Sequence, residues 1–156
     1  MAKRILIYYG DEIFKKPCRP VTVVNDHIRL LLGDLADTLA ATPDCHVLAA
    51  NQLGILRRLL VVNTDSGVVK LVNPVITEQS GEQDCYESCS SVRDISGMTI
   101  RPQKVTVAAL DEAGKQITRT FADDLALSLC HGIDHLDGKF FLEQVIRFDN
   151  KALEGE

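Results

Sequence analysis

Two histidines late in the chain, His131 and His135, have the spacing of metal ligands on a helix. Residues four apart on a helix lie one turn above the other and face the same way. Two imidazoles held in that arrangement supply half of a tetrahedral metal site. The pattern therefore favours metal binding over its alternative, a helix face whose two partly buried imidazoles only form hydrogen bonds.

The residue after the first histidine is Gly132, so the motif has the form H-G-x-x-H. In the H-E-x-x-H motif of metalloproteases, a glutamate at this position moves protons for a metal-bound water. Glycine has no side chain with which to do so. The sequence thus contains the metal-binding half of a hydrolytic site without its usual acid/base group.

A catalytic metal ion needs a third protein ligand and an open coordination position. Cys89 is the best candidate, because it lies between Ser88 and Ser90 in a polar stretch that we expect to be a loop. The residues alone do not decide this choice, since three other cysteines compete with it: Cys45, Cys85 and Cys130.

The histidines are expected on a helix over residues 122–136, which Gly138 ends. An earlier helix is predicted from Asp26 to Ala41 with Asn25 as its N-cap, because apolar residues recur there at helical spacing. Residues 5–9 are apolar and β-prone, and residues 80–84 are polar and loop-like. Apolar segments bounded by turn residues are predicted as strands at 59–62, 68–72, 99–102, 105–110 and 116–120. This order predicts an α+β fold with mostly antiparallel sheets packed around the C-terminal metal-binding helix.

The composition excludes several classes of protein. The chain has 156 residues, of which 46% are hydrophobic and 25% charged, so we expect one globular domain over residues 1–156. A net charge of −5 without a basic run argues against nucleic-acid binding. No apolar run reaches the roughly 18 residues of a membrane span. Because the five cysteines lack disulfide-framework spacing and no secretory signal is apparent, we predict a cytoplasmic protein.

Three ordered segments resemble the signatures of the peptide deformylases, which are G-x-G-L-A-A-P-Q, E-G-C-L-S and Q-H-E-x-D-H-L-x-G. Their counterparts here are residues 45–52, 87–91 and 130–138. Order and spacing agree nearly from end to end. The resemblance implies a deformylase-like fold and the family reaction, which is hydrolytic removal of the N-formyl group from formyl-methionine at a peptide N-terminus.

The resemblance also implies roles for single residues. Cys89, His131 and His135 match the three metal ligands of the family, whose ion is typically Fe²⁺, with Zn²⁺ or Ni²⁺ as substitutes. Gln52 matches a glutamine whose amide donates to the developing oxyanion, and the backbone N–H of Ser90 matches a second donor.

The departures from the signatures are concentrated around the site. Gly132 takes the place of the glutamate that serves as general acid and base. Five further positions differ in the first two segments, where the family lines its substrate channel: Cys45, Val47, Asn51, Ser88 and Ser90. This scatter indicates a naturally diverged member of the family.

Four titratable residues near the motifs are candidates to replace the missing glutamate: Cys45, His46, Glu87 and Asp134. Glu87 with Arg101 matches an ion pair that braces the cysteine segment, and Asp134 fits a position behind the ligands or on the helix surface. Cys45 and His46 are equally compatible with a packing role.

We therefore expect a deformylase-like protein with one divalent metal ion and weak or altered activity, because Gly132 replaces the glutamate. Its expected partner is a peptide N-terminus or a small amide or formyl substrate. The alternatives are a non-catalytic homologue that binds metal and peptide, and a metal-dependent amide or acyl hydrolase with another substrate. Replacing Gly132 by glutamate is expected to raise formyl-peptide hydrolysis.

Overall fold

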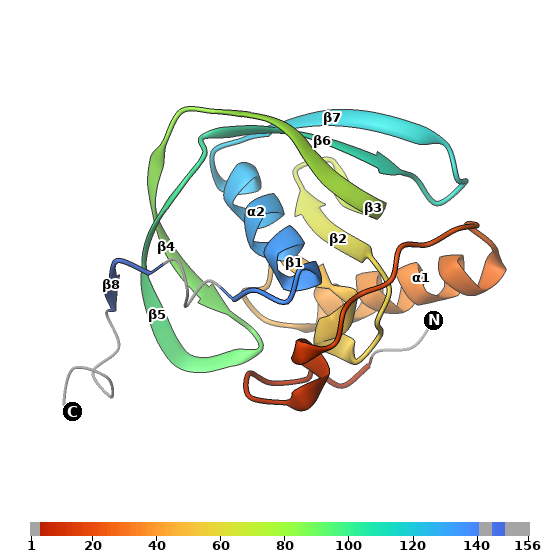
Figure 1. Ribbon diagram of the computed structural model, residues 1–156, viewed down its shortest axis with the longest axis horizontal. Helices are drawn as coiled ribbons and strands as arrows, with labels where there is room; N and C mark the ends of the chain where they lie inside the picture. The colour runs from red at the N-terminus through yellow and green to blue at the C-terminus, as the bar shows by residue number, and fades with distance from the viewer. Residues whose placement is uncertain (1–3, 141–144, 149–156) are drawn as a thin grey trace.

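The computed structural model describes residues 4–140 and 145–148 (Figure 1). The described elements follow in the order η1 (Glu12–Lys15), α1 (Asp26–Ala41), β1 (Val47–Ala49), η2 (Ala50–Leu53), β2 (Leu59–Thr64), β3 (Gly67–Ser80), β4 (Gln83–Cys89), β5 (Val92–Arg101), β6 (Lys104–Leu110), β7 (Gln116–Ala122), α2 (Asp124–Leu136) and β8 (Arg147–Phe148).

The strands form two antiparallel sheets. One has five strands in the order β1-β2-β3-β6-β7, and the other has three in the order β4-β5-β8. Helix α2 lies near the middle of the fold and contacts strands of both sheets (Figure 1). The predicted class, α+β with mostly antiparallel sheets around the C-terminal helix, is confirmed.

The five-stranded sheet lies between the two helices, and strand β2 shows this most directly. Its residues Leu60 and Val62 belong to the apolar cluster that includes α2. Leu59 and Val61 belong to the cluster that includes α1. Because successive side chains of a strand point to opposite faces, a strand covered on both sides is apolar throughout. This is why the sequence shows an unbroken apolar run at residues 59–62.

Both helix predictions are confirmed, with a shift at the start of α2. Helix α1 begins at Asp26, where the side-chain oxygen of Asn25 accepts a hydrogen bond of 3.0 Å from the N–H of Ile28. Helix α2 begins at Asp124 rather than at residue 122, because Ala122 still pairs with Lys104 between β7 and β6. None of the helices in the described part of the chain is long and apolar enough to cross a membrane.

Strand β3 is longer than predicted because it continues through Pro74 to Ser80. The pairing with β6 shifts in register between Val72 and Val75, and Asn73 has a φ of 53°. Proline is tolerated in a strand at such a bulge, where no ladder hydrogen bond is needed from it. The Asn73 side chain instead forms two 2.8 Å hydrogen bonds with the backbone of Val21.

Three local predictions differ from the structure. The loop predicted over residues 80–84 is confined to Gly81 and Glu82, since β3 extends to Ser80 and β4 begins at Gln83. The stretch that ends at Cys89 is likewise strand β4 and not a loop. The β-prone residues 5–9 form no strand either, although the N–H groups of Ile7 and Tyr9 bond to the carbonyls of Gln52 and Ser91 at 2.6 and 2.7 Å.

Candidate metal centre

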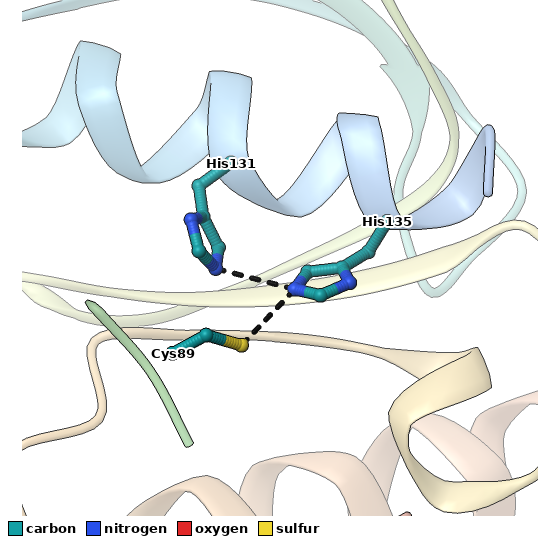
Figure 2. Close-up of side chains that lie close together, drawn as sticks. All are labelled: Cys89, His131 and His135. Carbon is teal, nitrogen blue, oxygen red and sulfur yellow. Dashed lines mark hydrogen bonds between the residues drawn. The ribbon is translucent and has the colours of Figure 1, made fainter. Parts of the chain in front are cut away.

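Helix α2 holds His131 and His135 one turn apart, as their spacing predicts. Their Nε2 atoms are 3.2 Å apart, and the two rings meet edge to face with centroids 4.8 Å apart. Both side chains are buried. Cys89 is the last residue of β4 in the three-stranded sheet, and its Sγ lies 3.2 Å from Nε2 of His135. Figure 2 shows the three side chains pointing toward one another.

The three ligand atoms lie within 4.8 Å of one another, so one ion can contact all of them. One thiolate and two imidazoles form a donor set that suits zinc or iron. Nδ1 of His131 is 2.9 Å from a carboxylate oxygen of Glu87, which leaves its Nε2 for the metal. The residues therefore fit a single divalent metal ion, and no second such group of ligands is found in the described residues.

The two imidazoles have opposite proton affinities. Burial disfavours the charged form of both rings. For His131, burial is outweighed by interactions with Cys89 and Glu87, which raise its pKa to about 9. For His135, burial and the neighbouring His131 hold the pKa well below its usual value. A metal ion binds the neutral imidazole, so a proton on His131 would compete with it, and metal affinity would fall toward acidic pH.

Glu87 and Arg101 form a buried, bidentate ion pair. Nε and Nη2 of Arg101 donate to the two carboxylate oxygens of Glu87 at 2.7 and 3.0 Å. Thr99 also donates to Glu87. Burial opposes the ionisation of Glu87, but hydrogen bonds from His131 and Arg101 lower its pKa to about 2. The remaining nitrogen of Arg101 donates to Asp134 at 2.8 Å. The predicted ion pair between Glu87 and Arg101 is confirmed. Because Glu87 also contacts His131, the pair orients this histidine as well as strand β4.

Gln52, in the short helix η2, points at the ligand cysteine. Its Oε1 accepts a hydrogen bond of 2.9 Å from the N–H of Ala49. Its Nε2 donates to Oγ of Ser91 at 3.0 Å and lies 3.6 Å from Sγ of Cys89 and 3.5 Å from Oγ of Ser90. An amide fixed in this way is positioned to donate to an oxygen beside the metal site. Ser90 begins the turn after β4, and the role of its backbone N–H stays a prediction.

Contacts that the sequence does not predict complete the surroundings of the ligands. The backbone N–H of Ser91 donates to Sγ of Cys89 at 3.4 Å. The Asn51 side chain donates to the carbonyl of His135 at 2.5 Å. Phe140 packs edge to face on the His135 ring at 4.8 Å. Asn51 replaces a proline of the family signature, and that departure was the one available signal.

A pocket of ≈ 320 Å³ opens beside the ligands. Cys89 and His131 line it together with Cys45, His46 and Val47 from the segment around β1. Burial raises the pKa of the Cys45 thiol, which contacts Oγ of Ser90 at 3.7 Å and the carbonyl of Val47. Of the four candidate bases, Glu87 and Asp134 both form ion pairs with Arg101, whereas Cys45 and His46 line the pocket without such a pairing to Arg101.

Comparison with known proteins identifies the family. The sequence profile of the family described as polypeptide deformylase matches residues 3–151. The chain belongs to the polypeptide deformylase family. Peptide deformylase 2 of Clostridium acetobutylicum is 46% identical over 148 residues, which is 95% of this chain and 99% of that protein.

Solved peptide deformylases have the same fold. The crystal structure from Legionella pneumophila superposes with a TM-score of 0.87 at 35% identity and covers 92% of this chain and 86% of that one. The structure from Synechococcus elongatus in complex with actinonin has a TM-score of 0.87 at 29% identity, with 93% and 80% coverage. Proteins with this name remove the N-formyl group from nascent peptides, and the family uses a single divalent metal ion.

Proposed function

We propose that this protein binds the formylated N-terminus of a peptide at a metal ion held by Cys89, His131 and His135, and that it removes the formyl group slowly. The observation that carries this proposal is the convergence of the three ligand atoms within 4.8 Å of one another, beside a ≈ 320 Å³ pocket that Cys89 and His131 line. The five free thiols, one of them a ligand, suit a reducing compartment, so we propose that the reaction takes place in the cytoplasm.

The ion in this proposal is Fe²⁺, with Zn²⁺ or Ni²⁺ as substitutes. A divalent ion in a three-ligand site activates water as a nucleophile and polarises a carbonyl oxygen. The chain itself supplies the positioning. Glu87 holds His131 in place, while the amide of Gln52 and the backbone N–H of Ser90 donate to the oxygen that gains negative charge.

The slow rate follows from the proton that the leaving amine requires. Gly132 supplies none, and two of the four candidate bases, Glu87 and Asp134, are bound to Arg101. General acid–base catalysis contributes about 100- to 10,000-fold to such reactions. We therefore expect turnover lower by a factor in that range than in deformylases whose motif contains the glutamate.

A second candidate concerns the substrate and rests on the lining of the pocket. Away from the ligands the wall mixes apolar side chains such as Pro43, Val47 and Leu127 with polar ones. The polar side chains include those of Asp44, His46, Tyr86, Ser88 and Ser128. These groups can form hydrogen bonds with a formylated or acylated amide that has a polar side chain, which methionine lacks. This protein would then be a metal-dependent amide hydrolase with a changed specificity.

The test is hydrolysis of formyl-methionyl peptides by protein loaded anaerobically with Fe²⁺, Ni²⁺ or Zn²⁺. We expect slow, metal-dependent release of formate, which the Cys89→Ser variant loses along with its bound metal. Cys85→Ser is the matched control, because Cys85 is a buried cysteine on the same strand that contacts the carbonyl of Gln83 rather than the ligands.

Three results would contradict the proposal in different ways. Formate release that does not depend on metal would remove the role of the ligands. Peptide binding without release would indicate a non-catalytic binding protein. Faster release from formylated serine or asparagine peptides than from methionine peptides would favour the second candidate.

A further inference from the structure

Gly132 is buried in the middle of α2 and has almost no space around it. A Cβ atom built on Gly132 would lie 2.5 Å from Cδ1 of Leu60, 2.8 Å from Cγ2 of Val47 and 3.3 Å from Cδ2 of Leu60. Real Cβ atoms essentially never lie within 3.0 Å of such a heavy atom. Glycine is also a poor helix former. A side chain at position 132 would therefore require Leu60 and Val47 to shift.

The two residues that fill this space have little freedom to move. Leu60 on β2 is completely buried within the cluster that packs against α2. Val47 pairs with Val62 and Ala49 pairs with Leu60, so Val47 and Leu60 are diagonal neighbours on the same face of the sheet. A β-branched side chain such as valine is also stiff about its first torsion angle.

Val47 borders both Gly132 and the pocket beside the candidate metal site. It lines the ≈ 320 Å³ pocket together with His131, Glu87 and Cys89, and its Cγ2 also faces Gly132. A side chain carried by residue 132 would therefore compete for space with a residue that forms part of the pocket wall. The family signature has glycine at this position, where this chain has Val47.

We propose that Val47 and Gly132 are a matched pair, in which Val47 occupies the space that a side chain at position 132 needs to reach the metal pocket. Val47 then determines whether this site can hold an acid/base group at all. The packing part of this inference is independent of the proposed function, and only its consequence for turnover rests on it. It also revises the expectation from the sequence, because Gly132→Glu alone has no room for its side chain.

The experiment measures the melting temperature and the bound metal of the full chain in four forms: the parent, Gly132→Glu, Val47→Ala/Gly132→Glu and Val62→Ala/Gly132→Glu. The Val62→Ala/Gly132→Glu variant is the matched control. Val62 is a completely buried valine that pairs directly with Val47 across the two strands. The three atoms nearest to the added Cβ nevertheless belong only to Leu60 and Val47.

We expect Gly132→Glu to lower the melting temperature by about 5 °C or more, since overpacking a core is destabilising. Val47→Ala should restore most of that loss and the bound metal, because the space it vacates also accepts the δ-methyl groups of Leu60. Val62→Ala should restore neither. If Gly132→Glu fails to fold, Gly132→Ala with the same two partners replaces it, because the Cβ alone already makes the short contacts.

Two outcomes would overturn the proposal. One is that the single substitution at position 132 leaves the melting temperature and the bound metal the same as in the parent. The other is equal rescue by Val47→Ala and Val62→Ala. Formyl-peptide turnover is a separate readout: a stable, metal-loaded Val47→Ala/Gly132→Glu protein that gains no turnover leaves the matched pair standing and contradicts the proposed function.

Discussion

At the scale of single residues, the buried side chain of Gln52 forms hydrogen bonds with both its amide oxygen and its amide nitrogen. Its carbonyl oxygen satisfies the backbone N–H of Ala49, and its amide nitrogen faces Ser91 and Cys89. With 1% of its surface exposed, it has no water to replace either contact. Its orientation is therefore fixed before any substrate binds, which is what an oxyanion donor requires.

Replacing Gln52 by leucine is expected to lower formate release about 100- to 1000-fold, the usual effect of removing one oxyanion donor. It should also cost about 1–3 kcal/mol of stability, because the N–H of Ala49 is left buried without its acceptor. Enzyme kinetics and denaturant unfolding measure the two effects. Gln79→Leu, at an exposed position of β3, is the control and should change neither. Full turnover in Gln52→Leu would show that this amide does not contact the reacting oxygen.

The role of a single residue could be predicted from the sequence only where it follows from the spacing of residues along the chain. The histidine pair follows from helix geometry, and the structure places both rings together. Cys89 could not be separated from the other cysteines without the resemblance to the family. Ser91 and Asn51 contribute through contacts with Cys89 and His135 that only the folded backbone creates.

At the scale of elements, the end of strand β4 is wrongly predicted as a loop, because one of the two buried side chains of this strand, Glu87, is charged. Cys85 and Glu87 point inward, while Tyr86 and Ser88 are exposed. The alternation of a strand is present in burial but not in hydrophobicity. Glu87 is buried only because Arg101 from β5 neutralises it, and this pairing across two strands is invisible to a local pattern. The helices, by contrast, follow local signals such as the Asn25 cap.

The Arg101 side chain ties three elements together, since it joins β5 to Glu87 on β4 and to Asp134 on α2. Arg101→Met is expected to cost about 3–5 kcal/mol, because it leaves a buried carboxylate without its partner. It should also weaken metal binding, since Glu87 orients His131. Denaturant unfolding and a metal titration measure these effects.

A surface ion pair supplies the control for this prediction. Lys70 lies 3.2 Å from Glu112, whose side chain is largely exposed. Lys70→Met should cost no more than about 1 kcal/mol and leave metal binding unchanged. Equal losses in the two variants would mean that Arg101 contributes only an ordinary surface charge.

At the scale of the whole molecule, the candidate metal centre connects the two sheets. Cys89 ends a strand of the three-stranded sheet, while His131 and His135 lie on the helix that packs against the five-stranded sheet. An ion bound to all three side chains cross-links parts of the fold that are far apart in the sequence. The antiparallel class of the sheets could be predicted from turn spacing, but this connection depends on how two separate layers meet.

Metal removal is therefore expected to destabilise the whole fold and not only the site. A ligand present at 100 times its dissociation constant stabilises the folded state by about 2.7 kcal/mol. For a chain of this size such a loss lowers the melting temperature by roughly 5–10 °C. Thermal unfolding of metal-loaded protein, with and without a chelator, measures the shift. The Cys89→Ser variant should show little response to the chelator, whereas Cys85→Ser should respond like the parent. An equal shift in Cys89→Ser would mean that the stabilising ion binds elsewhere, and the cross-link between the two sheets would have to be abandoned.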